Sequence, residues 1–403
     1  AGEKDGLEES LLRSRDAATA LATVLEGPST YLLMAANNAE MRSGSGMLLS
    51  AGLLVAADGN LEVTDLEPTA EMVLDEGVGI TDPDLEALWG FAGPDQDFRN
   101  LLLSPRLAPN AEMATRMWEA LGRPPVDGVI TVDVLALEDL LEAVGPVAIG
   151  TEQVDHTNVR RLLLHDQYTR VSQDRDGQAA RRDILGTVAR AVLERFDTSE
   201  PDPGALARAL RDSAAGRHLQ LWSSDGDLQQ AWRGIGVAGE VEPDGVLVSI
   251  LNDGNNKLDP FLEVEAELTP TDATTGTLRL EVTNTVGPGE PPYIAGADPE
   301  AVGGYGIYPG RLAVSFPAGT ELSVVEGPEA QESGPDGTTE VLAAPMRLAP
   351  GETVVWEVAY ELGQPLAALR VLPSARWPAI AWTAGGDRWD DVRSPRHTVD
   401  LPT

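Results

Sequence analysis

Residues 125–147 have the sequence PVDGVITVDVLALEDLLEAVGPV. Residues 126–132 are rich in β-branched side chains, which favours a strand. Asp133 follows as a typical helix N-cap, and apolar positions then recur at helical spacing until Ala143. Gly145 and Pro146 end the helix. A strand that leads straight into a helix is typical of α/β proteins, so this stretch predicts an α/β fold.

The rest of the first half adds strands and helices to this unit. Strand-like runs precede it at 31–35, 47–56 and 61–66, and the last two are joined by Asp-Gly-Asn, a strong hairpin signal. We also expect an N-terminal helix within 1–27, a long irregular crossing at 68–110, and mainly helices at 157–218. Together these patterns predict a mixed sheet flanked by helices.

The pattern changes near residue 240. Between 245 and 362, apolar and polar residues alternate in short runs that Pro and Gly separate, which is typical of an antiparallel β-sandwich. We therefore expect three parts: an N-terminal helix (1–27), an α/β domain (28–240), and a β-sandwich domain with a Pro-rich tail (241–403).

The composition excludes several classes of function. The 403 residues include 29 Lys and Arg against 65 Asp and Glu, a formal net charge of −36, which repels nucleic acid and anionic membrane surfaces. The chain has no cysteine, so disulfides, thiolate metal sites and cysteine nucleophiles are excluded. Its longest apolar run, 47–57, is about half of the roughly 20 residues that a spanning helix needs. Because the sequence starts at Ala1, we expect an anchoring segment upstream of it.

The segment 37–46, NNAEMRSGSG, lies between two predicted strands. Its Asn, Ser and Arg side chains donate hydrogen bonds, and its glycines let backbone N–H groups approach an anion. It lacks the Gly-Lys-Ser/Thr ending of a Walker loop. The segment therefore predicts an anion site, with an ordinary polar loop as the alternative.

Arginines are concentrated between residues 157 and 196, where eight arginines occur with five acidic residues. Guanidinium groups bind phosphate oxygens bidentately, so arginines that meet in one pocket would favour a phosphate or pyrophosphate ligand. The alternative is a helix surface on which each arginine pairs with a neighbouring acid. The arginines are Arg160, Arg161, Arg170, Arg175, Arg181, Arg182, Arg190 and Arg195.

A third cluster is 252–259, NDGNNKLD. Asx oxygens suit Ca²⁺, but the spacing does not fit an EF-hand loop. Asx residues with Gly are also common turn formers. A turn is the favoured interpretation, and a calcium site is the alternative.

Several of these stretches resemble the actinobacterial domain-of-unknown-function family 4012. They are 31–46 (YLLMAANNAEMRSGSG), 125–147, 252–259, 277–285 (TLRLEVTNT) and 305–316 (YGIYPGRLAVSF). The resemblance extends over residues 28–362. The family carries no established activity, and its members are commonly membrane-anchored envelope proteins.

The order of elements in the N-terminal half is also similar to that of the LytR-CpsA-Psr phosphotransferases, which move glycopolymers from a polyprenyl-pyrophosphate carrier onto peptidoglycan. This resemblance implies arginines on the pyrophosphate and carboxylates with Mg²⁺. It places Arg42 and Arg181 in catalytic positions, with Asp174 as a candidate catalytic carboxylate. The candidate ligand-binding residues are Asn37, Asn38, Glu40, Ser43 and Ser45 of the loop and Arg182 of the arginine cluster, together with Arg170, which the resemblance also places in the site.

Two positions depart from the phosphotransferase pattern. Thr69-Ala70 follow the third strand where those enzymes have an Arg-Asp pair, and Gly44 replaces the acidic residue of the first loop. The candidates to supply the missing metal-holding carboxylates are Glu40, Glu71, Asp174 and Asp176.

The expected function is therefore the binding, and by resemblance the transfer, of a polyprenyl-pyrophosphate-linked or phosphorylated glycopolymer. The expected setting is the cell envelope, outside the cytoplasm, with Mg²⁺ as cofactor and an envelope protein as a further partner. The alternative is a non-catalytic structural or interaction protein of the envelope with a degenerate site.

Overall fold

The computed structural model describes residues 22–24, 26–170, 175–198, 201–296, 304–392 and 396–402, together with Arg15 and Thr19. The helix expected within 1–27 therefore lies mostly outside the described residues. None of the helices in the described part of the chain combines the length and the hydropathy that crossing a bilayer requires.

The first half is built on a five-stranded sheet with the order β3-β2-β1-β4-β7. β1 runs parallel to β4, and the other neighbouring strands are antiparallel. The predicted hairpin turn joins β2 to β3 at Asp58 and Gly59, which both have positive φ. The prediction of a mixed sheet is confirmed. The strands are β1 (Ser29–Met41), β2 (Gly46–Ala57), β3 (Asn60–Pro68), β4 (Gly128–Val132) and β7 (Leu219–Ser223).

Helices cover both faces of this sheet. α3 (Leu107–Ala120) shares a hydrophobic core with Leu32 and Met34 of β1. Leu33 and Ala35 belong to the other core, with α4 (Val134–Val144) and α7 (Arg175–Thr198). Successive side chains of a strand point to opposite faces, so β1 supplies both cores. The remaining elements are α2 (Pro83–Trp89), β5 (Val147–Ile149), β6 (Glu152–Val154), α5 (Val159–Arg161), α6 (Gln167–Arg170), α8 (Pro203–Ala215) and α9 (Gly226–Gly234).

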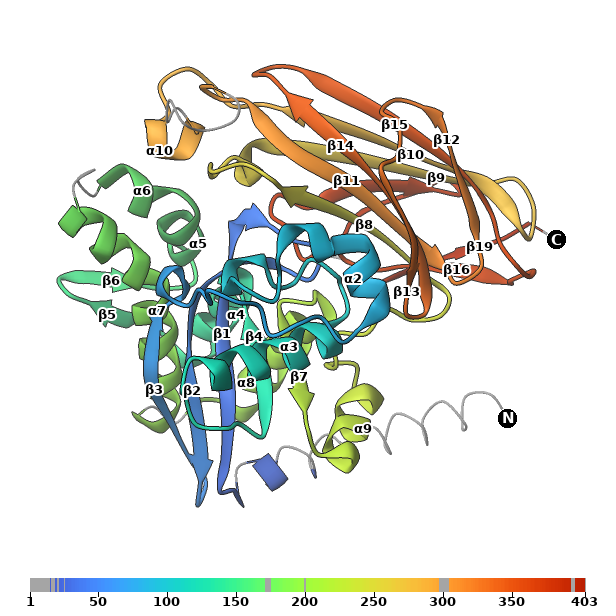
Figure 1. The fold of residues 1–403 in the computed structure, drawn as a ribbon. Helices are drawn as coiled ribbons and strands as arrows, with labels where there is room; N and C mark the ends of the chain where they lie inside the picture. Colours follow the sequence, from blue (N-terminus) through green and yellow to red (C-terminus); the bar gives the residue numbers. More distant parts are fainter. Residues whose placement is uncertain are drawn as a thin grey trace.

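The second half consists of two six-stranded sheets, drawn in yellow to red in Figure 1. Their orders are β12-β15-β10-β9-β17-β18 and β13-β14-β11-β8-β16-β19. Their inward-facing side chains share one core, as in a sandwich. The predicted sandwich is confirmed. The elements are β8 (Gly245–Asn252), β9 (Leu262–Pro270), β10 (Thr275–Asn284), α10 (Pro292–Ala295), β11 (Tyr308–Pro317), β12 (Glu321–Glu326), β13 (Glu332–Asp336), β14 (Thr339–Leu348), β15 (Thr353–Glu361), β16 (Ala368–Val371), β17 (Ile380–Ala384), β18 (Asp387–Asp390) and β19 (His397–Asp400).

Three expectations need correction. The Pro-rich tail after residue 364 contains β16 to β19, which complete both sheets of the sandwich. β16 and β17 pair in parallel with β8 and β9, so the sandwich is not purely antiparallel. Strands of four or five residues are too short for their alternation to stand out in the sequence. The crossing at 68–110, expected to be irregular, contains α2 and the start of α3.

The two halves share a hydrophobic core. Leu251 of β8, Ala313 of β11 and Val341 of β14 are buried in the cluster that contains Met34 and the apolar face of α3. The carboxyl end of β1 points toward β8 in Figure 1 and packs against it. The last residues of β1 therefore lie at the junction of the halves.

Candidate functional site

The candidate site lies where β1 extends beyond its neighbour. β1 pairs with β4 only as far as Ala35 and Val132, and its next residues continue toward the second half. The extension and the loop after it carry six predicted site residues, Asn37, Asn38, Glu40, Arg42, Ser43 and Ser45, all at most 7% exposed. The structure brings these residues together in the interior, and not in an open loop.

Asp133 is the common acceptor of one group. Its Oδ2 accepts from Asn38 Nδ2 (2.9 Å), Ser45 Oγ (3.0 Å) and His218 Nδ1 (2.8 Å). Its Oδ1 caps α4 by accepting from two backbone N–H groups, as the sequence predicts. Burial lowers the pKa of the His218 imidazole, but the charge and hydrogen bond of Asp133, together with the charges of Asp139 and Asp391, outweigh burial and the pKa lies above its usual value. Five donors therefore converge on the buried Asp133 carboxylate.

Asn37 and Arg42 bind groups of the protein itself. Asn37 Nδ2 donates to Leu163 O (3.0 Å) and to Tyr168 Oη (3.2 Å). Arg42 Nη1 donates to the carbonyl oxygens of Met41 (3.0 Å) and Asn252 (2.9 Å). Arg42 Nε is buried and has no hydrogen-bond partner. No carboxylate of the described residues lies within 4.0 Å of Arg42, but its charge interacts at longer range with the Asp253 carboxylate.

The cluster 252–259 faces this loop from the second half. Asn252 Nδ2 donates to Asn256 Oδ1 (3.0 Å) and to Asp259 Oδ2 (2.7 Å). Asp259 also accepts from the Met41 backbone N–H (3.1 Å) and from Tyr308 Oη (3.0 Å). Burial raises the pKa of Asp259 to about 6. The Asx oxygens therefore face donors within the protein, which favours the turn over a calcium site.

Glu40 meets a cation that the sequence analysis did not single out. Lys257 Nζ lies 2.6 Å from Glu40 Oε2, and both side chains are at most 5% exposed. The ammonium also lies 5.5 Å from the ring centroid of Tyr168 and 5.1 Å from that of Tyr293. Tyr168 belongs to the first half and Tyr293 to the second, and their rings stack. The only available signal was that Lys257 is one of two lysines in the chain.

A further cation lies close by. Arg99, between α2 and α3, pairs with Asp97 and its side chain is 40% exposed. The hydrogen bond with Asp97 raises the pKa of Arg99, and the negative charge of Glu40 adds to this effect. Arg42, Arg99 and Lys257 therefore surround the end of β1 in a chain whose net charge is −36.

The arginine cluster of 157–196 is described only in part. Arg160 pairs with Glu138 and stacks over Trp377, and Arg161 pairs with Asp166. These contacts agree with the ion-pair alternative. The side chains of Arg170, Arg181 and Arg182 lie outside the described part of the structure, as does all of Asp174. That these arginines meet Arg42 remains a prediction.

The described residues do not fit Mg²⁺. The carboxylates at the end of β1 are Glu40, Asp133 and Asp259, and each already accepts from an ammonium, a hydroxyl or N–H groups. Throughout the described ranges, no group of three His, Cys, Asp or Glu residues is placed to hold an ion. Hard cations of this size need several free oxygen ligands.

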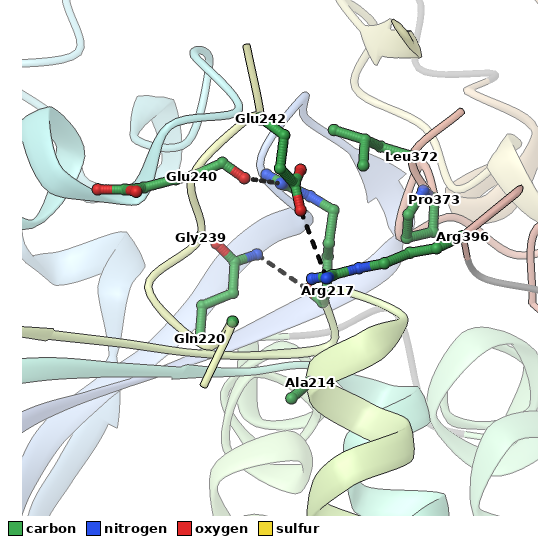
Figure 2. A pocket seen from close by; sticks show the side chains of 10 residues that line it. Ala214, Arg217, Gln220, Gly239, Glu240, Glu242, Leu372, Pro373 and Arg396 are labelled. Atoms are coloured by element: carbon green, nitrogen blue, oxygen red, sulfur yellow. Dashed lines mark hydrogen bonds and ion pairs between the residues drawn. The ribbon is translucent and has the colours of Figure 1, made fainter. Parts of the chain in front are cut away.

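A small cavity lies elsewhere at the junction, between Arg217, Gln220, Glu242 and Arg396 (Figure 2). Arg217 is buried and donates to the carbonyl oxygens of Glu240 and Pro105, and burial lowers its pKa to about 10. Arg217 Nε and Gln220 Oε1 have no partner. The cavity has a volume of about 10 Å³, room for about one water molecule. It is too small for a glycan or a phosphate ester.

The chain thus combines two parts. The first is an α/β half whose central strand ends in a buried polar network, and the second is a β-sandwich. Residues 26–168 match the model of the family described as "Protein of unknown function (DUF4012)". The resemblance to this family is confirmed over that segment. No curated protein matches the chain.

Solved structures resemble part of the chain. The Lin1025 protein of Listeria innocua is 13% identical, with 53% of this chain and 80% of that chain covered and a TM-score of 0.28. TagV of B. subtilis is 14% identical, with 52% and 80% covered and a TM-score of 0.28. TagT bound to LI-WTA is 14% identical, with 52% and 76% covered and a TM-score of 0.22. At sequence identities and TM-scores this low, the similarity does not show a shared function.

Proposed function

We propose that this protein binds a phosphorylated or polyprenyl-pyrophosphate-linked glycopolymer of the cell envelope, outside the cytoplasm. The observation that carries the proposal is the set of three cations at the carboxyl end of β1. One of them, Arg42, is buried, its Nε has no hydrogen-bond partner among the described residues, and a buried charge is stabilised by an opposite one. Ligands of α/β proteins commonly bind outside the carboxyl ends of strands. The resemblance of the N-terminal half to the LytR-CpsA-Psr phosphotransferases supports the class of ligand.

Binding is proposed here without transfer. Phosphoryl transfer needs the developing charge to be neutralised from several sides, commonly by metal ions that carboxylates hold. The described carboxylates around β1 are occupied by donors of the protein. Within the described residues this favours binding over metal-dependent transfer, and the side chains of Asp174 and Asp176 lie outside them.

The test is isothermal titration of the purified chain with inorganic pyrophosphate and with farnesyl pyrophosphate. Wild-type protein is expected to bind both. Arg99→Ala is expected to weaken binding by about 10- to 150-fold, because a charge-assisted hydrogen bond contributes about 1.5–3 kcal/mol. The matched control is Arg279→Ala, because Arg279 lies on the outer face of the sandwich and pairs with Glu281.

Absence of binding to either ligand would contradict the proposal and favour the structural alternative. That alternative also has an observation in its favour, since Asn37, Asn38 and Arg42 bind the protein's own carbonyl groups. A loss of affinity of the same size in Arg279→Ala would show that the effect depends on overall charge and not on this site.

A further inference from the structure

Lys257 occupies an unusual position for a lysine. Its side chain is 5% exposed, it comes from the sandwich half, and its ammonium contacts a carboxylate of the α/β half. Its backbone N–H donates to Ile294 O (2.9 Å), which ties the residue to α10. Lysine is almost never fully buried unless it is paired, so the position is specified by its surroundings.

These surroundings compensate the charge only in part. An ammonium has three N–H donors, and among the described residues Glu40 is the acid that lies within 4.0 Å of Nζ. The ring centroids of Tyr168 and Tyr293 lie 5.5 and 5.1 Å from Nζ, and their π electrons stabilise the cation. A ring face is a weaker acceptor than an anionic oxygen, so a phosphate oxygen is a better partner for the remaining N–H groups.

The same contact occupies one oxygen of Glu40, a candidate metal ligand. At 2.6 Å the ammonium stands where a cation bound to Oε2 would have to stand. Displacing it would leave a buried ammonium unpaired, which is costly. Arg42 is a second buried cation at this end of β1, and its Nε has no hydrogen-bond partner among the described residues.

We propose that Lys257 is the resident cation of this site, so that phosphate groups bind beside it without a divalent metal. The sandwich half thereby supplies the positive charge that lies beside Glu40 of the α/β half. The inference rests on the proposed function, because it concerns how the same site recognises its ligand.

The experiment compares pyrophosphate binding in Mg²⁺ with binding in excess EDTA. The expected dissociation constants agree within about twofold. The decisive variant is Glu40→Gln, which keeps the size of the side chain and removes its charge. Because it leaves the buried ammonium of Lys257 unpaired, a cooperative thermal transition first establishes that the variant is folded. Pyrophosphate binding is expected to be at least as tight in Glu40→Gln as in wild type, because Lys257 then has no competing anion. A metal-holding Glu40 predicts the opposite, a loss of binding.

Removal of the ammonium needs a variant that leaves no buried charge unpaired. Glu40→Gln combined with Lys257→Met removes both charges, and its folding is checked by a cooperative thermal transition. Its affinity for pyrophosphate is expected to fall by about tenfold or more relative to Glu40→Gln. Arg279→Met is the control, with unchanged affinity.

The outcomes separate the two proposals. Binding that EDTA abolishes and Mg²⁺ restores would overturn the resident-cation inference and leave the proposed function standing. Binding of Mn²⁺ to the ligand-free protein, measured by electron paramagnetic resonance and lost in Glu40→Gln, would also overturn it. Absence of pyrophosphate binding in both conditions would overturn the proposed function and the inference together.

Discussion

Polar side chains are buried at the end of β1, whereas along β10 they lie at the surface. β10 alternates between buried and half-buried residues over ten positions, and its charged residues Arg279 and Glu281 pair at the surface. The last residues of β1 are all buried, including Asn37, Asn38 and Glu40. On β10 water solvates the polar groups, whereas on β1 each group needs a partner within the protein. The end of β1 is therefore stable only as part of the whole chain.

The largest expected effect is that of Lys257→Met. The variant leaves Glu40 buried and unpaired, and breaking a buried ion pair from one side costs about 3–5 kcal/mol. We expect a loss of this size in the free energy of unfolding, measured with urea. Arg279→Met, which breaks the surface pair on β10, is expected to leave the urea midpoint unchanged.

A second variant tests whether the loss comes from the unpaired charge. The double variant Glu40→Gln with Lys257→Met is expected to recover most of the lost stability, because no buried charge is left unpaired. A single Lys257→Met variant that is as stable as wild type would contradict the burial of this ion pair.

The next effect is a pH dependence with a defined sign. Asp259 has a pKa of about 6 in the folded state against 3.8 when unfolded, because burial disfavours its charge. A raised carboxyl pKa gives stability that is present below pH 3.8 and is lost as the pH rises through 6. The loss is about 3 kcal/mol. Asp259→Asn cannot ionise, so its urea stability is expected to fall less between pH 4 and pH 7 than that of wild type.

A surface carboxylate provides a comparison, because its contribution to stability changes with pH in the opposite direction. Asp272, in the turn between β9 and β10, accepts hydrogen bonds from the backbone and side chains of Thr274 and Thr275, which lower its pKa to about 2. Its stabilisation is present above pH 3.8 and is lost as the pH falls through 2. Asp272→Asn is therefore expected to lose stability at neutral pH and not at pH 2. A fall of the Asp259→Asn variant equal to that of wild type would contradict the assignment of the titration to Asp259.

A smaller effect is expected from Asn38→Ala. Asn38 donates to Asp133 and to Ala375 O, and its Oδ1 accepts from Val134 N. Unsatisfied buried groups cost about 1–3 kcal/mol, so urea unfolding is expected to show a loss in this range. Thr277→Ala on β10 is the control and is expected to stay within about 0.5 kcal/mol of wild type. Equal losses in both variants would show that water reaches the end of β1.

This comparison also explains what the sequence could predict. The strands of the sandwich and the capped helix at Asp133 follow from neighbours within a few residues, and the structure confirms both. The partners of Asn38 lie 95 and 337 residues away, at Asp133 and Ala375. No local periodicity encodes such contacts. The loop 37–46 was therefore predicted as polar and functional in character, but its burial and the role of Lys257 could not be predicted.

The smallest effect is expected on the outer face of the sandwich. Glu265 of β9 lies directly opposite Glu281 of β10, and like charges at opposed positions destabilise a sheet by about 0.2–1 kcal/mol. Glu265→Gln is therefore expected to raise the melting temperature slightly at low salt. The gain should vanish at 1 M salt, where the Debye length is about 3 Å.

Glu263→Gln is the matched control, because Glu263 lies opposite Thr283 and has no like charge to lose. The loss in Lys257→Met should persist at high salt, since a buried pair is screened much less than a surface pair. A Glu265→Gln variant that melts below wild type would contradict the repulsion and show that the Glu265 carboxylate has a favourable partner on this face.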